Sequence, residues 1–171
     1  MRRYILIPIL LSFGCGIKAN PEVLKEPEVV IKRIGHKVYV KSLFGEIRVK
    51  GFERVEDHWI KENKEAFCFL IERVGGKSHK FCVEEAIEER PLLKVKEEKD
   101  YVEIVASGFE GYRLYPTDKG RINFQMAKDF KDGLSLERDY WERCYAITGV
   151  RASLESSPVE LCVKPKPPPV V

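Results

Sequence analysis

The positions of five cysteines constrain this 171-residue chain more than any other feature of its sequence. One of them, Cys15, follows an N-terminal apolar run almost at once. The other four form two pairs with similar neighbours, Cys68 with Cys82 and Cys144 with Cys162. Each cysteine of a pair lies in a short run of aromatic and β-branched residues, which is typical of a strand. The sequence therefore predicts two disulfides and one cysteine with a separate role.

The N-terminus has the pattern of an export signal. Arg2 and Arg3 supply positive charge, and the apolar stretch 4–13 is too short to span a bilayer. The segment from Leu11 to Cys15 resembles the signal of bacterial lipoproteins, in which a small residue precedes the cysteine that receives the lipid. This resemblance implies that residues 1–14 are a lipoprotein signal peptide.

The same resemblance implies a diacylglycerol on Cys15 and a short tether over residues 15–20. The expected location is then the bacterial cell envelope, where the lipid holds the chain to the outer membrane or to a periplasmic membrane face. Cleavage near Ala19 is the alternative, and it would leave a periplasmic or secreted protein. No later apolar run is long enough to cross a bilayer, so the membrane is expected as a partner through Cys15 alone.

The charge balance argues against a nucleic-acid partner. The chain has 30 basic and 27 acidic side chains, and loss of Arg2 and Arg3 with the signal would leave it nearly neutral. Basic and acidic residues are interspersed rather than gathered into a basic stripe. Binding to nucleic acid is therefore not expected.

The chain after the signal reads as two copies of one unit. The runs around the second cysteine pair repeat those around the first, and segment 49–55 is matched with segment 109–115. No long helix is indicated, and stretch 126–133 is interpreted as a decorated loop with at most two helical turns. Successive strands without helices between them favour antiparallel β-sandwiches. The clearest predicted strands are 37–41, 101–106, 111–115 and 145–150.

Each cysteine pair is expected to staple a β-hairpin. Gly75-Gly76 lies at the midpoint of Cys68 and Cys82, and two glycines suit a tight turn in which both residues have positive φ. Opposed residues of an antiparallel pair are close enough for a disulfide. The second hairpin is expected to have a longer tip, over residues 151–158. Because side chains alternate along a strand, the disulfides are expected outside the core.

Two stretches resemble fibronectin type III domains. Segment 111–115 resembles the third strand of that family, and 144–150 followed by 155–160 resembles its last two strands and their loop. The resemblance covers almost all of the mature chain and implies an all-β fold of two tandem antiparallel β-sandwich domains, fibronectin type III or immunoglobulin-like. The first copy is short, which allows either a lost edge strand or two units that share one interface. The predicted divisions are domain 1 at 21–89, domain 2 at 90–165 and a Pro-rich tail at 166–171.

Three aromatic residues are candidates for a binding surface. Trp59 and the pair Tyr140 and Trp141 each precede a cysteine-bearing strand, in segments expected to be loops. If they are exposed, they form a platform for sugar stacking or protein docking, and if they are buried, they cap the end of a sandwich. Capping is the expectation, and the platform is the alternative.

Nothing in the sequence indicates catalysis, a metal or a cofactor. His36, His58 and His79 have no metal-ligand spacing among themselves or with the cysteines. Nucleophile elbows and phosphate-binding glycine loops are absent from the sequence, and the paired glutamates near residues 84–98 are interpreted as a solvated linker.

The sequence therefore favours a non-enzymatic envelope lipoprotein that acts as a spacer or protein-interaction module. Such a protein is expected to bind another envelope protein, which the resemblance implies. A carbohydrate-binding or adhesion accessory role is the alternative, and a hydrolase is the less favoured one.

Overall fold

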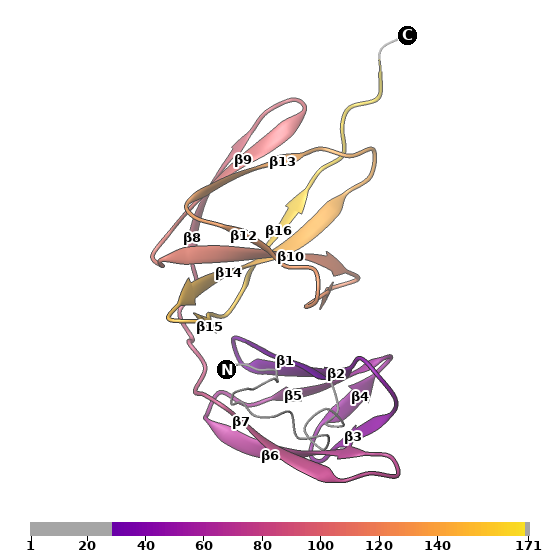
Figure 1. The fold of residues 1–171 in the computed structure, drawn as a ribbon. Helices are drawn as coiled ribbons and strands as arrows, with labels where there is room; N and C mark the ends of the chain where they lie inside the picture. The colour runs from indigo at the N-terminus through magenta and orange to yellow at the C-terminus, as the bar shows by residue number, and fades with distance from the viewer. Residues whose placement is uncertain (1–28, 170–171) are drawn as a thin grey trace, which may run out of the picture. The chain divides into compact units, whose positions relative to one another are not determined.

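The structure is a computed structural model that describes residues 29–169. The described residues form strands, turns and irregular segments and contain no helix, and hence no helix that could cross a membrane. The strands predicted at 37–41, 101–106, 111–115 and 145–150 are all present. The predicted all-β fold is therefore confirmed (Figure 1).

Contacts divide the chain into two units between Ile87 and Glu88. The signal, the tether with Cys15 and the first residues of predicted domain 1 lie outside the described residues. Unit 1 is described from residue 29 and unit 2 up to residue 169.

The described part of unit 1, from residue 29, is a sandwich of seven strands. One sheet has the order β1-β2-β5-β4 and the other β3-β6-β7, and all neighbours are antiparallel. This is the strand order of constant-type immunoglobulin domains, in which the fourth strand joins the first sheet. Its bounds are β1 Val29–Ile34, β2 Lys37–Ser42, β3 Ile47–Val49, β4 Glu53–Val55, β5 His58–Glu62, β6 Phe67–Arg73 and β7 Ser78–Val83.

The core of unit 1 lies between these two sheets, because strand alternation turns one apolar row from each sheet inward. The burial pattern of β6 shows this alternation, since Phe69 and Ile71 are buried while Cys68 and Leu70 are exposed. The buried residues come from both sheets: Val38, Val40, Ile47, Val49, Phe69, Ile71 and Val83.

Unit 2 is also a sandwich. One sheet has the order β8-β9-β13, and in the other β10 pairs with β14, β11 and β12, while β14 also pairs with β15 and β16. β10 is the third strand of the unit, as the family resemblance predicted. Its bounds are β8 Leu92–Glu97, β9 Tyr101–Ser107, β10 Gly111–Asp118, β11 Arg121–Ile122, β12 Lys128–Phe130, β13 Gly133–Glu137, β14 Arg143–Arg151, β15 Leu154–Glu155 and β16 Val159–Val163.

The interpretation of 126–133 as a loop is wrong in part. Lys128–Phe130 forms β12, whose residues lie opposite 112–114 of β10. The stacked rings of Phe130 and Tyr112, 5.4 Å apart, hold it on the sheet. Pairing with a long neighbouring strand thus decides the structure of a segment whose own pattern was ambiguous.

The third strands of the two units differ in length, and the predicted match of 49–55 with 109–115 is wrong. In unit 1, β3 ends at Val49, and the amide of Phe52 donates to the carbonyl of Val49 across a tight turn. Gly51 has a φ of 85° in that turn, a value that favours glycine at the third position of a type II turn. Gly111, its proposed counterpart, instead begins the eight-residue strand β10.

Both disulfides staple hairpins, as predicted. Cys68 lies opposite Cys82 on β6 and β7, and Cys144 lies opposite Cys162 on β14 and β16, with 4.0 Å between the Cα atoms in each pair. None of the four belongs to a core cluster. At the tip of the first hairpin only Gly75 has positive φ, so the expectation of two such residues is wrong there.

The second hairpin does not have the long tip that was expected. Its turn is the two-residue pair Ala152 and Ser153, with φ values of 50° and 72°. The extra length lies in a bulge between β15 and β16, where Ser156 is buried. The Ser156 hydroxyl accepts a hydrogen bond from the Gly149 amide at 2.8 Å and donates one to the Ser157 carbonyl at 3.0 Å. The bulge is therefore a hydrogen-bonded part of the sheet.

Candidate binding surface

The loop between β13 and β14 presents two large aromatic rings to solvent. Tyr140 is 69% exposed and Trp141 is 57% exposed. The expectation that these two residues cap the sandwich is therefore wrong. We call residues 138–142 the aromatic loop.

Arg138 fixes this loop to the body of unit 2. It is buried, and its guanidinium donates to the carbonyl of Glu98 at 2.8 Å and to that of Lys164 at 3.0 Å. A third contact reaches the Glu97 carboxylate at 3.3 Å, and the Arg138 amide donates to the Asp100 carbonyl. One side chain thus joins the loop to the β8–β9 turn and to the segment after β16. The loop is consequently held from both sides.

Two cations lie over the exposed rings. The Arg143 guanidinium is 5.2 Å from the centre of the Trp141 ring, and the Lys166 ammonium is 5.5 Å from that of Tyr140. Asp139 links these groups, since its carboxylate accepts from Arg143 at 2.9 Å and its carbonyl from the Lys166 amide at 2.7 Å. The Tyr140 amide and the Arg143 guanidinium donate to the Asp139 carboxylate and lower its pKa. The rings therefore have one face covered by a cation and stay in place while exposed.

Trp59 does not belong to such a surface. It lies within β5 in unit 1 and packs, partly buried, against the core of that unit, with the Arg54 guanidinium 5.7 Å from its ring. Its expected loop position is wrong, because the turn ends at Asp57 and the strand begins at His58. Trp59 thus lies partly buried in unit 1, whereas Tyr140 and Trp141 lie exposed in one loop of unit 2.

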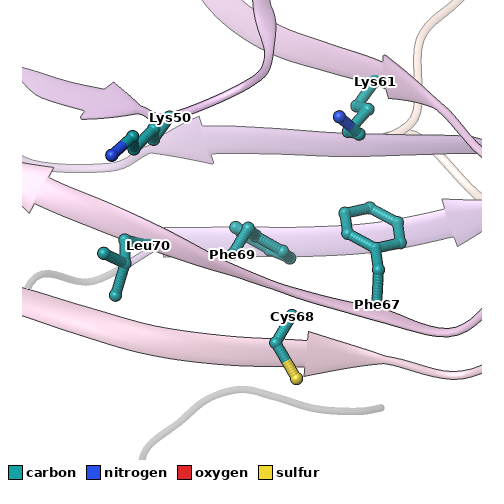
Figure 2. Close-up of a pocket in the computed structure, with 6 residues that line it drawn as sticks. All are labelled: Lys50, Lys61, Phe67, Cys68, Phe69 and Leu70. Carbon is teal, nitrogen blue, oxygen red and sulfur yellow. The ribbon is translucent and has the colours of Figure 1, made fainter.

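Unit 1 has a hollow beside β6. Its volume is about 270 Å³, and its wall includes two phenylalanines and two lysines (Figure 2). The lining residues are Lys50, Lys61, Phe67, Cys68, Phe69 and Leu70.

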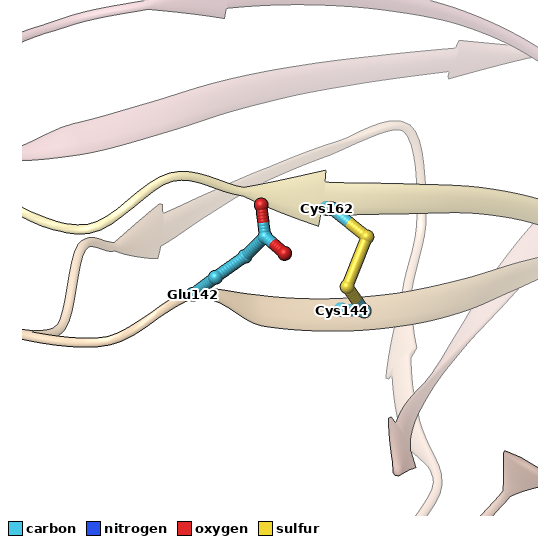
Figure 3. A group of neighbouring side chains, drawn as sticks. All are labelled: Glu142, Cys144 and Cys162. Carbon is cyan, nitrogen blue, oxygen red and sulfur yellow. A yellow bond between two sulfur atoms is a disulfide. The ribbon is translucent and has the colours of Figure 1, made fainter. Parts of the chain in front are cut away.

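The Cys144–Cys162 disulfide lies next to Glu142 (Figure 3). Potential ligand atoms of these three residues are within 4.8 Å of one another. Both sulfur atoms are consumed by the disulfide, and a metal ligand would have to be a thiolate. This cluster is therefore not a metal site while the disulfide is intact.

A buried polar network in unit 2 had no sequence signal. The Glu155 carboxylate accepts from the Tyr115 hydroxyl at 2.5 Å, from the Thr148 hydroxyl at 2.9 Å and from the Arg113 guanidinium at 2.8 Å. Arg113 also donates to the exposed Asp129 at 2.7 Å. Burial, reinforced by the Glu155 charge, raises the pKa of Tyr115 well above its usual value. Burial alone would lower the pKa of Arg113, but Glu155 and Asp129 outweigh it and the net shift is upward.

No protein family model matches the chain, and no curated protein matches it. Among solved structures, the crystal structure of the rat CD45 extracellular region, domains d3-d4, is similar over 96% of this chain and 82% of that chain. The sequence identity is 11% and the TM-score 0.36, too low to assign a function or a partner. The β-sandwich architecture follows from the strand pairings of each unit.

Proposed function

We propose that this chain is a non-enzymatic, lipid-anchored protein of the bacterial cell envelope that docks another envelope protein through its aromatic loop. The signal before Cys15 and two disulfides, which are typical of secreted or extracytoplasmic proteins, support the location. The two sandwich units would then act as a spacer. The observation that carries the docking role is the exposure of Tyr140 and Trp141 on a loop that is held from both sides.

The composition of the loop suits protein docking. Tyrosine, tryptophan and arginine are the residues that most often dominate the binding energy of protein interfaces. Because Arg138 and Asp139 already fix the loop, little conformational entropy is lost when a partner binds. Asp139 balances the charge of Arg143, so Lys166 beside Tyr140 is the cation that favours an acidic side chain on the partner, next to an apolar centre.

The docking role can be tested by crosslinking the lipidated protein in native envelope membranes. The double variant Tyr140→Ala/Trp141→Ala should lose its main crosslinked partner. Leu92→Ala/Val105→Ala is a matched control, because Leu92 is 71% and Val105 53% exposed on β8 and β9 of the same unit, outside the aromatic loop. An unchanged crosslinking pattern for the loop variant would refute the docking role.

The anchor is tested separately by Cys15→Ser. Acyl chains contribute about 0.8 kcal/mol per buried methylene, so their loss should move the protein from the membrane to the soluble fraction. A variant that stays with the membranes would show that the lipid on Cys15 is not the anchor.

Carbohydrate binding is the second candidate. Each exposed ring has a cation over one face, and the opposite face of such a ring can stack on a sugar. Co-sedimentation with purified envelope polysaccharide, lost in Trp141→Ala and retained in the Leu92→Ala/Val105→Ala control, would favour this role over protein docking.

A further inference from the structure

Part of one edge of a central strand in unit 1 has no neighbour among the described residues. β6 spans Phe67–Arg73, but β3 pairs only with its residues 71–73, and the Lys50 amide adds one bond to the Leu70 carbonyl. Among the described residues, no strand pairs with 67–69 on the side opposite β7. The corresponding strand of unit 2 is covered, because β10 pairs with β14 as far as Cys144.

The backbone of Cys68 points to this open edge. In an antiparallel strand the N–H and C=O of one residue point the same way, and those of the next residue point the other way. The Leu70 carbonyl bonds toward β3, so Cys68, two residues earlier, also points to the β3 side. The 4.0 Å between Cys68 and Cys82 Cα atoms agrees, since the closest opposed pairs are those that exchange no hydrogen bonds with each other.

The open edge borders the hollow in unit 1. Figure 2 shows Phe67 and Phe69 on one side of β6, toward Lys50 and Lys61, and Cys68 and Leu70 turned the other way. The Lys61 ammonium lies 5.8 Å from the centre of the Phe67 ring and 3.3 Å from the Gly51 carbonyl. None of the six lining residues is acidic. The hollow therefore combines unpaired strand backbone, an aromatic wall and two positive charges.

We propose that this edge accepts an extended acidic peptide from a partner protein, which adds to β6 where β3 ends. The peptide backbone pairs with the N–H and C=O of Cys68, as in other cases of strand addition. Its acidic side chains face Lys50 and Lys61 on the Phe67 side of β6, and the apolar side chains between them face the exposed Cys68 and Leu70 on the other side. This inference deepens the proposed protein-docking function by giving the chemistry of a second contact.

The probe is a terminally blocked hexapeptide of alternating glutamate and valine, titrated into the full mature chain made soluble by Cys15→Ser. Saturable binding is expected, and a lysine–valine hexapeptide should bind at least tenfold more weakly. Lys50→Gln and Lys61→Gln should each weaken binding about twofold to fivefold, as for exposed ion pairs. Lys94→Gln, which removes an exposed charge from β8 in unit 2, should leave it unchanged. Thermal unfolding of each variant establishes that it is folded.

Backbone pairing has its own readout. Hydrogen exchange of the Cys68 amide should slow when the hexapeptide binds, whereas the Phe69 amide, which points toward β7, should not change. Absence of saturable binding, or binding without an effect on the Cys68 amide, would overturn strand addition. If Lys94→Gln weakened hexapeptide binding equally, the binding would depend only on the net charge of the protein, and strand addition at β6 would be overturned as well.

The two proposals can fail independently. The Tyr140→Ala/Trp141→Ala variant should bind the hexapeptide normally, because its changes lie in unit 2. Suppose that this variant loses the crosslinked envelope partner and that no variant of the protein binds the hexapeptide. The docking role of the aromatic loop would then stand, and only the site in unit 1 would be refuted.

Discussion

The ring of Phe109 lies directly on the backbone of Gly149. A Cβ atom on Gly149 would overlap the ring, and the φ of this glycine is not positive, so its missing side chain is needed for space. The Arg151 guanidinium lies 4.7 Å from the centre of the same ring, and Tyr112 meets it edge-on at 6.4 Å. Gly149 thus leaves room on β14 for the Phe109 ring to pack against the strand backbone.

Gly149→Ala should destabilise unit 2 by about 1–3 kcal/mol, because the Phe109 ring must move out of a packed site. Chemical denaturation of the full chain would measure the loss. Gly133→Ala is the control, since its Cβ would lie 3.6 Å from the nearest backbone atom and should fit. Equal unfolding free energies for the two variants would contradict the packing role of Gly149.

Glu155→Gln should destabilise the protein by roughly 2–4 kcal/mol. The Glu155 carboxylate accepts hydrogen bonds from three donors. The amide group of glutamine would place N–H donors against some of these donors, so that hydrogen bonds would be lost. It would also leave Arg113 without its buried counter-charge. Urea unfolding measures the change. Asp129→Asn removes the other, largely exposed, partner of Arg113 and should cost less than about 1 kcal/mol. If both variants lost a similar amount of unfolding free energy, the burial of Glu155 would not explain its contribution to stability.

Stability should fall at alkaline pH. Burial, with a smaller effect of Glu62, raises the pKa of Tyr39 from its ordinary 10.0 to about 12. A group whose pKa is higher in the folded state stabilises fully below its unfolded pKa and loses this contribution as pH rises through the folded value. The unfolding free energy should therefore decrease between pH 10 and pH 12.

Tyr115, whose pKa is also raised, should add to this decrease. Tyr39→Phe, which cannot ionise, should flatten part of the slope when unfolding is followed at pH 8, 10, 11 and 12. A slope identical to that of the unchanged protein would mean that Tyr39 is not protected in the folded state.

Unit 2 should fold alone, because it has its own core and disulfide. A fragment from Glu88 to Val171 should give a β-type circular dichroism spectrum and a cooperative thermal transition. The fragment from Arg90 to Pro165 should be less stable by about 1 kcal/mol, because it lacks the Glu89–Arg151 ion pair and the Lys166–Asp139 backbone bond. A disordered Glu88–Val171 fragment would contradict independent folding.

Local patterns predicted the hairpins well. Opposed cysteines, alternating aromatics and the glycines at 75 and 76 all depend on residues close in sequence, so β6 and β7 could be predicted with their pairing. The turn at Ala152 and Ser153 was missed because neither residue marks a turn with two positive φ values. The end of β3 at Val49 was also missed, because a glycine at position 51 is compatible with both a strand and a turn.

The candidate binding surface could not be derived in the same way. Tyr140 and Trp141 were identified as candidates, but the loop that presents them is held by Arg138. The partners of Arg138 are backbone carbonyls 40 and 26 residues away, and such carbonyls leave no trace in side-chain composition. The open edge of β6 at Cys68 could not be predicted either, because it exists only where β3 ends at Val49.

The attachment of Lys164 and Lys166 to the aromatic loop has a practical consequence for protein engineering. The chain leaves Lys166 beside Tyr140, and the three prolines after it can add only roughly 10 Å, at about 3.1 Å per residue. An affinity tag, fluorophore or fused enzyme placed directly after Pro169 would therefore begin within roughly 10 Å of Lys166, beside the surface proposed for docking. Reporters inserted at the Gly75-Gly76 turn would instead be attached to unit 1, which does not carry that surface.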